Sequence, residues 1–544
     1  MNDNQHIRNF SIIAHINHGK STLADRFIEL CKNKKIKKSD AQYLDSMIIE
    51  RERGITIKAQ CLRLNYTYKN IQYSLNLIDT PGHADFSDEV SRSLDACEGV
   101  VLLIDITKGI QAQTIANYKK AIEKKLAVIV ALNKIDLNIE KDNIKAEIAT
   151  LLKIDHFVEI SAKTGNGLIN LIEKIIENIP APTIDSTKTE FSALIIDSWF
   201  NNYTGVNCLI KVKSGSINVG EKIYLLDDNK TYKINELGIF VPEKLTMQKI
   251  SVGEIGFLNL NAKDLSKIKV GSYISTKKNT HHEKNIKTIT PNIYANIYPI
   301  NTDDFIILKK AIEKLSLNDA SLSFTISKSQ MFGSGFNCGF LGILHLEITK
   351  ERLEQEHNLS IIITPPSITF KIITTRMKIL YISNPSDIDK INDIREIHEK
   401  MTLTTIISQK IYLGKIINLC QEARGIKNEI IHNNEKVYIK YTIPLSELIF
   451  NFHSKLQSIT NGYASLTYDL LDYEKSDLNK LSILINEKKI DALEFVVHKS
   501  KTDKTSQELI EKMVNIIPRQ LFDIKIQAAI GKKIIKRETI KALK

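Results

Sequence analysis

The sequence has few of the features that mark secreted, membrane-spanning or zinc-binding proteins. Its six cysteines in 544 residues lie far apart and form no Cys-x-x-Cys pair. That spacing argues against a zinc site and against a disulfide scaffold, and it indicates a reducing compartment. No apolar run approaches the ~18 residues of a membrane span, and the start, MNDNQHIRNF, resembles no signal peptide. We therefore expect a cytoplasmic protein without a transmembrane segment.

Acidic residues are outnumbered, and the imbalance is concentrated near the end of the chain. The formal net charge is +12, from 75 Lys and Arg against 63 Asp and Glu. Residues 481–544 hold 14 basic and 8 acidic side chains, a net +6 that is half of the total. Such an excess favours a polyanionic partner such as RNA. The alternative is a general abundance of lysine, as AT-rich genomes produce.

The pattern of apolar residues divides the chain into several domains, as about 100–200 residues per domain would suggest. Apolar strands that alternate with amphipathic stretches predict an α/β domain with a mostly parallel sheet, whereas later segments with a period of two predict β-structure. The expected domains are an α/β P-loop domain (1–185), a β-barrel (186–275), two small α+β domains (291–371 and 395–478) and a basic α+β C-terminal domain (479–544). Residues 374–394 look like a looser connection, and the last segment shows a basic helical pattern.

A phosphate-binding loop is predicted where AHINHGKST (14–22) follows the apolar strand FSII and precedes a helical stretch. In that context backbone N–H groups at the helix start bind phosphate. We expect Lys20 to reach the β- and γ-phosphates, Ser21 to bind Mg²⁺ and Thr22 to contact the α-phosphate. Ala14 replaces the first glycine of the usual loop pattern. The other loop residues expected to contact the nucleotide are Asn17, His18 and Gly19.

Three further motifs follow in order, each at the end of an apolar strand. In IDTPGHADF (78–86), Asp79 is expected to hold Mg²⁺ through water, and the Gly82 N–H to meet the γ-phosphate. In NKID, Asp136 offers two carboxylate oxygens to the N1–H and 2-amino group of guanine, which adenine cannot match. The residues expected to surround the base are Asn133, Lys134, Ile135, Ser161, Ala162 and Lys163. Four such motifs along one sheet edge predict GTP as the ligand.

Residues between these motifs are candidates for switching and hydrolysis. Thr56 in RERGITIKAQ (51–60) is placed to bind Mg²⁺ only while GTP is bound. His83 directly follows Gly82, where GTP hydrolases hold a residue that positions water. Ile16 and Ile55 could screen His83 from that water, or they could be ordinary core residues. The charged side chains of 51–53 are read as a solvated helix end.

These motifs resemble those of the translational GTPases. HGKST, RERGITI, DTPGH, NKID and SAK carry that resemblance, and ALIIDSWFNNYTGV, GSGFNCGFLGILHLEI, NGYASLTYDL and IPRQLFDIKIQAAIG are similar to the LepA branch of the family over essentially the whole chain. Elongation factor G is the nearest alternative, but it carries an additional G-domain insert and a large extra domain. The resemblance implies two ferredoxin-like α+β domains and a ribosome-stimulated GTP hydrolase that is monomeric and binds GTP and Mg²⁺.

The resemblance also implies what such a factor does. LepA-like proteins bind bacterial-type (70S) ribosomes that carry tRNA, and they are credited with moving tRNAs one codon backward under stress. An alternative role in the family is ribosome assembly or initiation, with GTP as an occupancy switch. A pool associated with the cytoplasmic membrane is implied as well. The family has a further basic tail after IKRETIKALK, and its absence from this sequence suggests a truncated C-terminal domain.

Asn17 stands where the family has aspartate. In related GTPases this position helps to hold a monovalent cation beside the phosphates, and a neutral asparagine oxygen could still bind K⁺. The alternative is that Asn17 only shapes the turn by bonding its own backbone. The residues alone leave both possibilities open.

Overall fold

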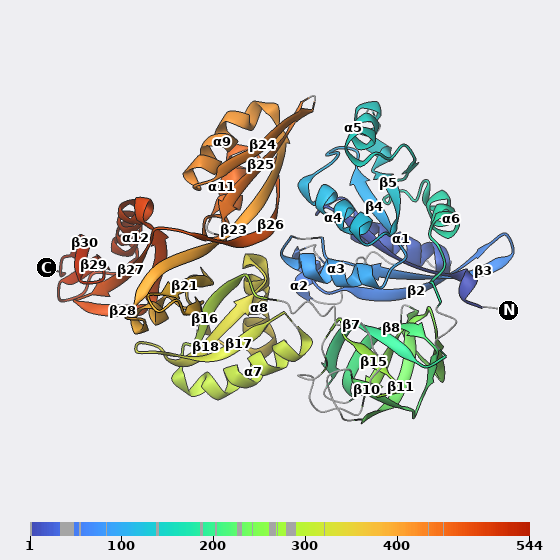
Figure 1. The fold of residues 1–544 in the computed structure, drawn as a ribbon, viewed down its shortest axis with the longest axis horizontal. Coiled ribbons are helices and arrows are strands. Elements are labelled where there is room, and N and C mark those ends of the chain that lie inside the picture. The colour runs from blue at the N-terminus through green and yellow to red at the C-terminus, as the bar shows by residue number, and fades with distance from the viewer. Residues whose placement is uncertain are drawn as a thin grey trace. The chain divides into compact units, whose positions relative to one another are not determined.

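The structure is a computed structural model, and it describes residues 3–32, 48–53, 56–82, 84–137, 141–184, 189–201, 204–225, 231–241, 243–260, 268, 270–278, 290–319, 321–433, 435–449 and 451–543. The chain divides into two compact units. Unit 1 comprises residues 1–289, 317–320 and 465–467, and unit 2 contains the rest. Figure 1 labels many of the elements of both units. Within the described ranges, no helix is long and apolar enough to cross a membrane.

Unit 1 begins with a six-stranded sheet in the order β2-β3-β1-β4-β5-β6. Its strands are β1 (Ile7–Ala14), β2 (Gln60–Tyr68), β3 (Ile71–Asp79), β4 (Gly99–Asp105), β5 (Ala127–Asn133) and β6 (Phe157–Glu159). The helices are α1 (Lys20–Lys32), α2 (Ile48–Arg53), α3 (Ser87–Asp95), α4 (Ala112–Glu123), α5 (Asp142–Leu152) and α6 (Leu168–Asn178). All strand pairs are parallel except β2–β3, which is a long antiparallel hairpin. The mostly parallel sheet was expected, but the antiparallel edge strand was not.

Apolar residues cover both faces of this sheet, as parallel strands between helices require. Alternate residues of one strand enter different cores: Ile12 packs in the core with Phe27 of α1, whereas Ile13 packs in the core with Leu94 of α3. Because the strands are parallel, their carboxyl ends meet at one edge. The four predicted motifs therefore converge there.

The second domain of unit 1 is the predicted β-barrel. Seven antiparallel strands run in the order β10-β15-β7-β8-β14-β11-β12, and an extra pairing of β10 with β11 closes the sheet. The bounds are β7 (Ser192–Asn201), β8 (Gly205–Ser214), β9 (Ser216–Asn218), β10 (Lys222–Leu225), β11 (Thr231–Val241), β12 (Glu243–Met247), β13 (Lys249–Ser251), β14 (Ile255–Leu260) and β15 (Tyr273–Ser275). An ion pair of 2.9 Å between Arg63 and Glu254 joins the barrel to the first sheet.

Unit 2 contains two domains with the β-α-β-β-α-β order of ferredoxin-like folds. The first has a sheet β17-β18-β16-β19. Its elements are β16 (Ile293–Pro299), α7 (Phe305–Asn318), β17 (Ser323–Ser329), β18 (Gly333–Phe340), α8 (Ile343–His357), β19 (Ile361–Ile363) and the short β20 (Ser367–Ile368). The second is built on β23 (Ile394–Gln409), α9 (Leu413–Glu422), β24 (Ile426–Asn433), β25 (Lys436–Pro444), α10 (Leu445–Ile449), α11 (Phe452–Ile459) and β26 (Ser465–Lys475).

The segment 374–394, expected to be loose, is instead part of the second sheet. β21 (Phe370–Thr374) and β22 (Ile379–Ile382) form a hairpin, and β21 pairs with β23 along its other edge. Ile372, Ile382 and Ile388 are buried in a shared core beneath it. The two strands are only five and four residues long, which made them hard to distinguish from a loop in the sequence. The expected boundaries at 371 and 395 therefore cut through one sheet.

The C-terminal domain is α+β as expected, but its last segment is a strand rather than a helix. It consists of β27 (Leu478–Ile485), β28 (Lys488–His498), α12 (Thr502–Ile516), β29 (Ile524–Ile530) and β30 (Lys533–Ile540). Gly531 has φ of 56°, so it allows the tight turn that joins β29 to β30. Pairing with β29 overrides the helical pattern of the basic residues.

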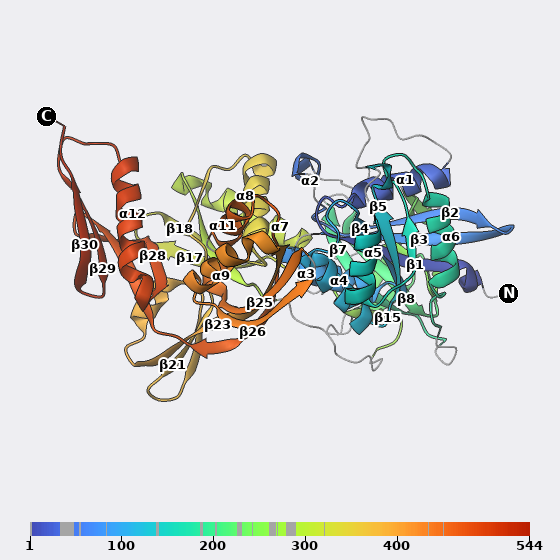
Figure 2. The same cartoon turned by 90° about the horizontal axis from the view of Figure 1, so that it is seen from above.

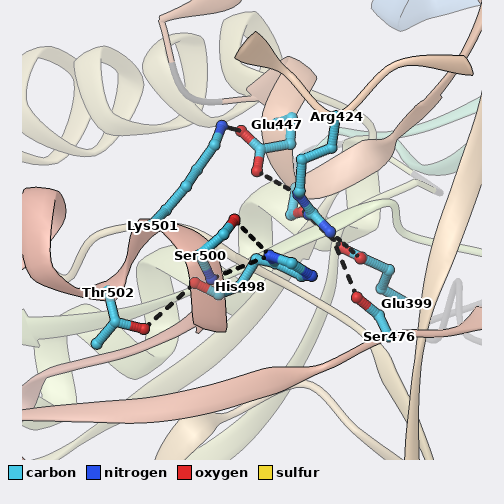
Figure 3. Close-up of polar contacts among 9 residues, drawn as sticks. Glu399, Arg424, Glu447, Ser476, His498, Ser500, Lys501 and Thr502 are labelled. Atoms are coloured by element: carbon cyan, nitrogen blue, oxygen red, sulfur yellow. Dashed lines mark hydrogen bonds and ion pairs between the residues drawn. The ribbon is translucent and has the colours of Figure 1, made fainter. Parts of the chain in front are cut away.

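Partly buried ion pairs join this domain to the second ferredoxin-like domain. Arg424, just after α9, binds the Glu399 carboxylate through two nitrogens at 2.7 and 3.0 Å. Its Nε donates to Glu447 at 2.8 Å, and Glu447 also pairs with Lys501, which precedes α12. Figure 3 shows these carboxylates on either side of the guanidinium. Together they connect β23, α10 and the C-terminal domain.

Candidate nucleotide-binding site

The predicted phosphate loop lies between β1, which ends at Ala14, and α1, which begins at Lys20. Gly19 in this loop has φ of 95°, and a Cβ built there would lie 2.5 Å from Nδ2 of Asn133. Only glycine fits both requirements without strain. Lys20 opens the helix, with Ser21 half-buried and Thr22 exposed after it. The loop therefore has the strand, turn and helix start of a phosphate-binding site.

The side chains of Lys20, Thr56 and Asp79 meet at the sheet edge and are buried. The Lys20 ammonium lies 2.6 Å from Oδ1 of Asp79 and 2.7 Å from Oγ1 of Thr56. Thr56 Oγ1 donates to the other Asp79 oxygen at 3.2 Å. Residues far apart in the sequence, each predicted for the γ-phosphate or Mg²⁺, are thus in direct contact. Hydroxyl and carboxylate oxygens are the hard ligands that Mg²⁺ prefers, so this group of residues fits that ion.

The residues predicted for the base lie together at the ends of β5 and β6. Asn133 donates to the carbonyl of His18 at 2.9 Å and accepts from the Ala162 N–H at 2.9 Å. Ser161 donates to Oδ1 of Asp136 at 2.7 Å, which orients that carboxylate. Asn133 therefore ties the phosphate loop to the SAK turn. Ile135 follows in the same segment, and its N–H donates to the Ile160 carbonyl.

Lys134 holds the outer side of the phosphate loop. Its ammonium forms an ion pair with Asp105 at 2.6 Å and donates to the Asn17 carbonyl at 3.3 Å. Asn17 is exposed and has φ of 65°, a conformation that asparagine tolerates better than most residues. The backbone of Asn17 is thus suited to the turn, while its side-chain carbonyl is at the surface.

Comparison with known proteins finds family models that match three parts of the chain. A family model described as the elongation factor Tu GTP binding domain matches residues 5–181. Two others match later parts of the chain, the elongation factor G C-terminus at 396–484 and the GTP-binding protein LepA C-terminus at 485–544. Together these matches support a translational GTPase of the LepA type. A crystal structure from Thermus thermophilus is similar over 87% of this chain and 97% of that chain, with a TM-score of 0.64. At 14% identity that likeness shows the shared multidomain fold.

In this LepA-type GTPase the ring of His18 turns into the sheet. Its Nδ1 accepts from the Asp105 N–H at 3.3 Å, and the ring stacks edge-on with His15. Burial lowers the pKa of His18 to about 4, although nearby Asp105 opposes that shift. The imidazole is therefore neutral at pH 7. The backbone N–H of His18 donates to the His15 carbonyl, so a contact between His18 and phosphate stays a prediction.

Two side chains of the site were missed by the sequence analysis. Burial alone would raise the pKa of Asp105, but the Lys134 ammonium and hydrogen bonds from Thr107 lower it. Arg26 of α1 donates to the carbonyls of Ala162 and Lys163 at 3.1 and 3.5 Å, which fixes the SAK turn. Asp105 ends an apolar strand, a signal that could have found it. Arg26 carries no such signal.

Two of the predicted hydrolysis residues, His83 and Ile55, lie outside the described residues. Their predicted partners can be placed. Gly82 lies beside Ile16, because a Cβ built on Gly82 would be 4.0 Å from Cγ1 of Ile16. Glu50 of α2 accepts from the N–H groups of Ile57 and Lys58 at 2.9 and 3.1 Å, which anchors the chain after Thr56. Arg51 and Glu52 are exposed, as a solvated helix end would be.

Proposed function

We propose that this chain is a ribosome-stimulated GTP hydrolase that moves tRNAs back by one codon on improperly translocated ribosomes under stress. The observation that carries the proposal is the presence, on one chain, of the GTP binding domain and the LepA C-terminus. The first supplies a nucleotide switch. The second distinguishes the chain from a general elongation factor, and its basic character suits a partner made of RNA.

Guanine is selected by Asp136 in this proposal. Both of its oxygens accept hydrogen bonds, and the N1–H and 2-amino group of guanine are adjacent donors. Ser161 already orients this carboxylate, so less side-chain freedom is lost when the base binds. The Ala162 N–H donates to Asn133, so the guanine O6 is expected to meet other N–H groups of the SAK turn.

Thr56 connects the nucleotide to the switch. It lies three residues after α2, and its hydroxyl donates to the same carboxylate that Lys20 neutralises. Bound Mg²⁺, held by Ser21, Thr56 and, through water, Asp79, would neutralise phosphate charge. Thr56 is expected to bind Mg²⁺ only while the γ-phosphate is present. When the γ-phosphate leaves, that interaction is lost and the segment that carries Thr56 is released. His83 would orient the attacking water, with Ile16 and Ile55 controlling its access.

Asn17 offers a further ligand atom beside the phosphates, and we include K⁺ as a candidate cofactor. Asn17→Gly is the decisive variant, because glycine keeps the positive φ and removes the side-chain oxygen. The cation proposal expects ribosomal hydrolysis that is faster in K⁺ than in Na⁺, and loss of that preference in Asn17→Gly. If Asn17→Gly equals the wild type in both salts, position 17 only shapes the turn.

The experiment that tests the function compares GTP turnover on 70S ribosomes with turnover on isolated subunits. Stimulation by 70S ribosomes that carry tRNA, together with a one-codon backward shift in a toeprint of the mRNA, supports the proposal. Stimulation only by the small subunit or by assembly precursors would instead favour an assembly or initiation factor. Cell fractionation and sedimentation would test the accompanying proposals of a monomer that is cytoplasmic with a peripheral membrane pool.

A further inference from the structure

One face of the second sheet in unit 2 carries aromatic and basic side chains that are exposed or half-buried. The β21–β22 hairpin places Lys371 directly opposite Tyr381, and β23 places His398 on the other side of Lys371. These three side chains form a row across three strands, on the same face because facing residues in paired strands point the same way. Figure 2 labels β21 on this narrow two-stranded hairpin.

A second tyrosine extends the row. The ring of Tyr473 on β26 lies edge-on to Tyr381, with 5.7 Å between the ring centroids. The ammonium of Lys400 is 5.6 Å from the Tyr473 centroid, which is a cation–π distance. Tyr381 is 62% exposed. We call these five side chains the Tyr381 face: Lys371, Tyr381, His398, Lys400 and Tyr473.

The opposite face of the same sheet is fully used by the fold. Ile372 and Ile382 are buried there, and Val496 of β28 packs against them. The Tyr381 face is therefore not needed to hold the C-terminal domain in place. An exposed ring on a sheet whose other face is already buried suggests a surface for a partner.

The basic side chains on and near this face favour an anionic partner. Residues 370–382 contain Lys371, Arg376 and Lys378 and no acidic residue. Glu396, which lies on the face, already binds Lys475 and His398 at 3.1 Å each. Lys371 and Lys400 form no ion pair with any of the described residues. An anionic partner with flat rings matches this combination of an exposed tyrosine with two lysines that form no ion pair with the described residues.

We propose that the Tyr381 face binds unpaired nucleotides of RNA, with a base stacked on Tyr381 and the phosphates near Lys371 and Lys400. Base faces are free for stacking only where RNA is single-stranded, and sheet surfaces with aromatic and basic side chains bind RNA in this way. The inference deepens the proposed function by naming a partner class. Only the source of the strand, ribosomal RNA, rests on the proposed function.

The test measures the affinity of the full chain for a short, unstructured, fluorescein-labelled RNA by fluorescence anisotropy. Tyr381→Ala should weaken binding by roughly 5- to 150-fold, the range for loss of one stacked base. Tyr381→Phe should retain binding. Tyr463→Ala is the matched control, because Tyr463 is 57% exposed and also stacks on a second tyrosine, Tyr412. That control should bind as the wild type does.

Salt dependence separates the two kinds of contact. Lys371→Gln should reduce the slope of log K against log salt by about 0.7, whereas Tyr381→Ala should leave that slope unchanged. A duplex of the same sequence should bind without dependence on Tyr381. Thermal unfolding and GTP affinity, measured on each variant, show whether it is folded.

Equal affinities of Tyr381→Ala and Tyr463→Ala for the single strand would overturn the proposal. So would loss of ribosome binding in Tyr381→Ala with unchanged RNA affinity, since the face would then contact a ribosomal protein. Ribosome-stimulated GTP turnover is measured in parallel on the wild type. If turnover is not stimulated but RNA binding depends on Tyr381, the proposed function fails and the RNA site stands.

Discussion

The ammonium of Lys20 and the carboxylate of Asp79 form a 2.6 Å ion pair with almost no access to solvent. Removing one partner of a buried pair leaves a charge that nothing compensates, at a cost of about 3–5 kcal/mol. We therefore expect Lys20→Met and Asp79→Asn each to destabilise the nucleotide-free protein strongly, and the double variant to cost much less than their sum. Hydrogen exchange of the β1 and β3 amides reports the free energy of opening this sheet. Additive effects would show that the pair is not coupled.

Low pH should reduce the stability of the nucleotide-binding domain through protonation of His18 on unfolding. Its pKa is about 4 in the folded protein and 6.5 otherwise, so between these values the unfolded chain binds the extra proton. Stability due to His18 is full above pH 6.5 and falls as the pH drops, by about 2 kcal/mol between pH 7 and pH 5. His18→Gln should flatten this part of the curve of stability against pH. Parallel curves for variant and wild type would assign the acid sensitivity to other groups.

Asp136→Asn should lower GTP affinity by roughly 10²-fold or more. The N1–H and the 2-amino group of guanine each need an acceptor, and the asparagine amide provides only one oxygen. The amide offers one acceptor and one donor, which suits the extra oxygen of xanthine. Binding of GTP and XTP, measured side by side, gives the ratio that matters. Ser161→Ala is the control, since it frees the Asp136 carboxylate without changing its chemistry. An unchanged GTP/XTP ratio in Asp136→Asn would remove this residue from the base site.

The basic surface of the C-terminal domain should contribute to ribosome binding through charge. Lys532, Lys533, Lys536 and Arg537 are exposed on or beside β30. Replacing all four by glutamine should reduce the slope of log K against log salt by roughly 3. A matched variant with arginine at the three lysine positions should keep the wild-type slope. The same slope in the glutamine variant would mean that these charges are a general lysine excess.

Sequence patterns predicted which segments meet at this sheet edge because the phosphate loop, DTPGH, NKID and SAK each follow an apolar strand. The parallel sheet brings the ends of those strands together, as the contacts of Lys20 with Asp79 and of Asn133 with His18 and Ala162 show. Strands that are stabilised mainly by pairing with other strands could not be predicted from the sequence pattern. The strands β21 and β22 are only five and four residues long, and β30 is rich in charged residues. Their strand neighbours decide their structure. Arg26 was missed because its acceptors are backbone carbonyls of residues 162 and 163, which leave no trace in composition.

The most direct test of the account measures GTP turnover with and without 70S ribosomes for the wild type and for His83→Ala. The wild type should be strongly stimulated by ribosomes. His83→Ala should bind GTP almost normally and lose roughly 10²- to 10⁴-fold of the stimulated rate, as expected for a group that positions the attacking water. Wild-type turnover in His83→Ala, or no stimulation of the wild type by ribosomes, would contradict the account.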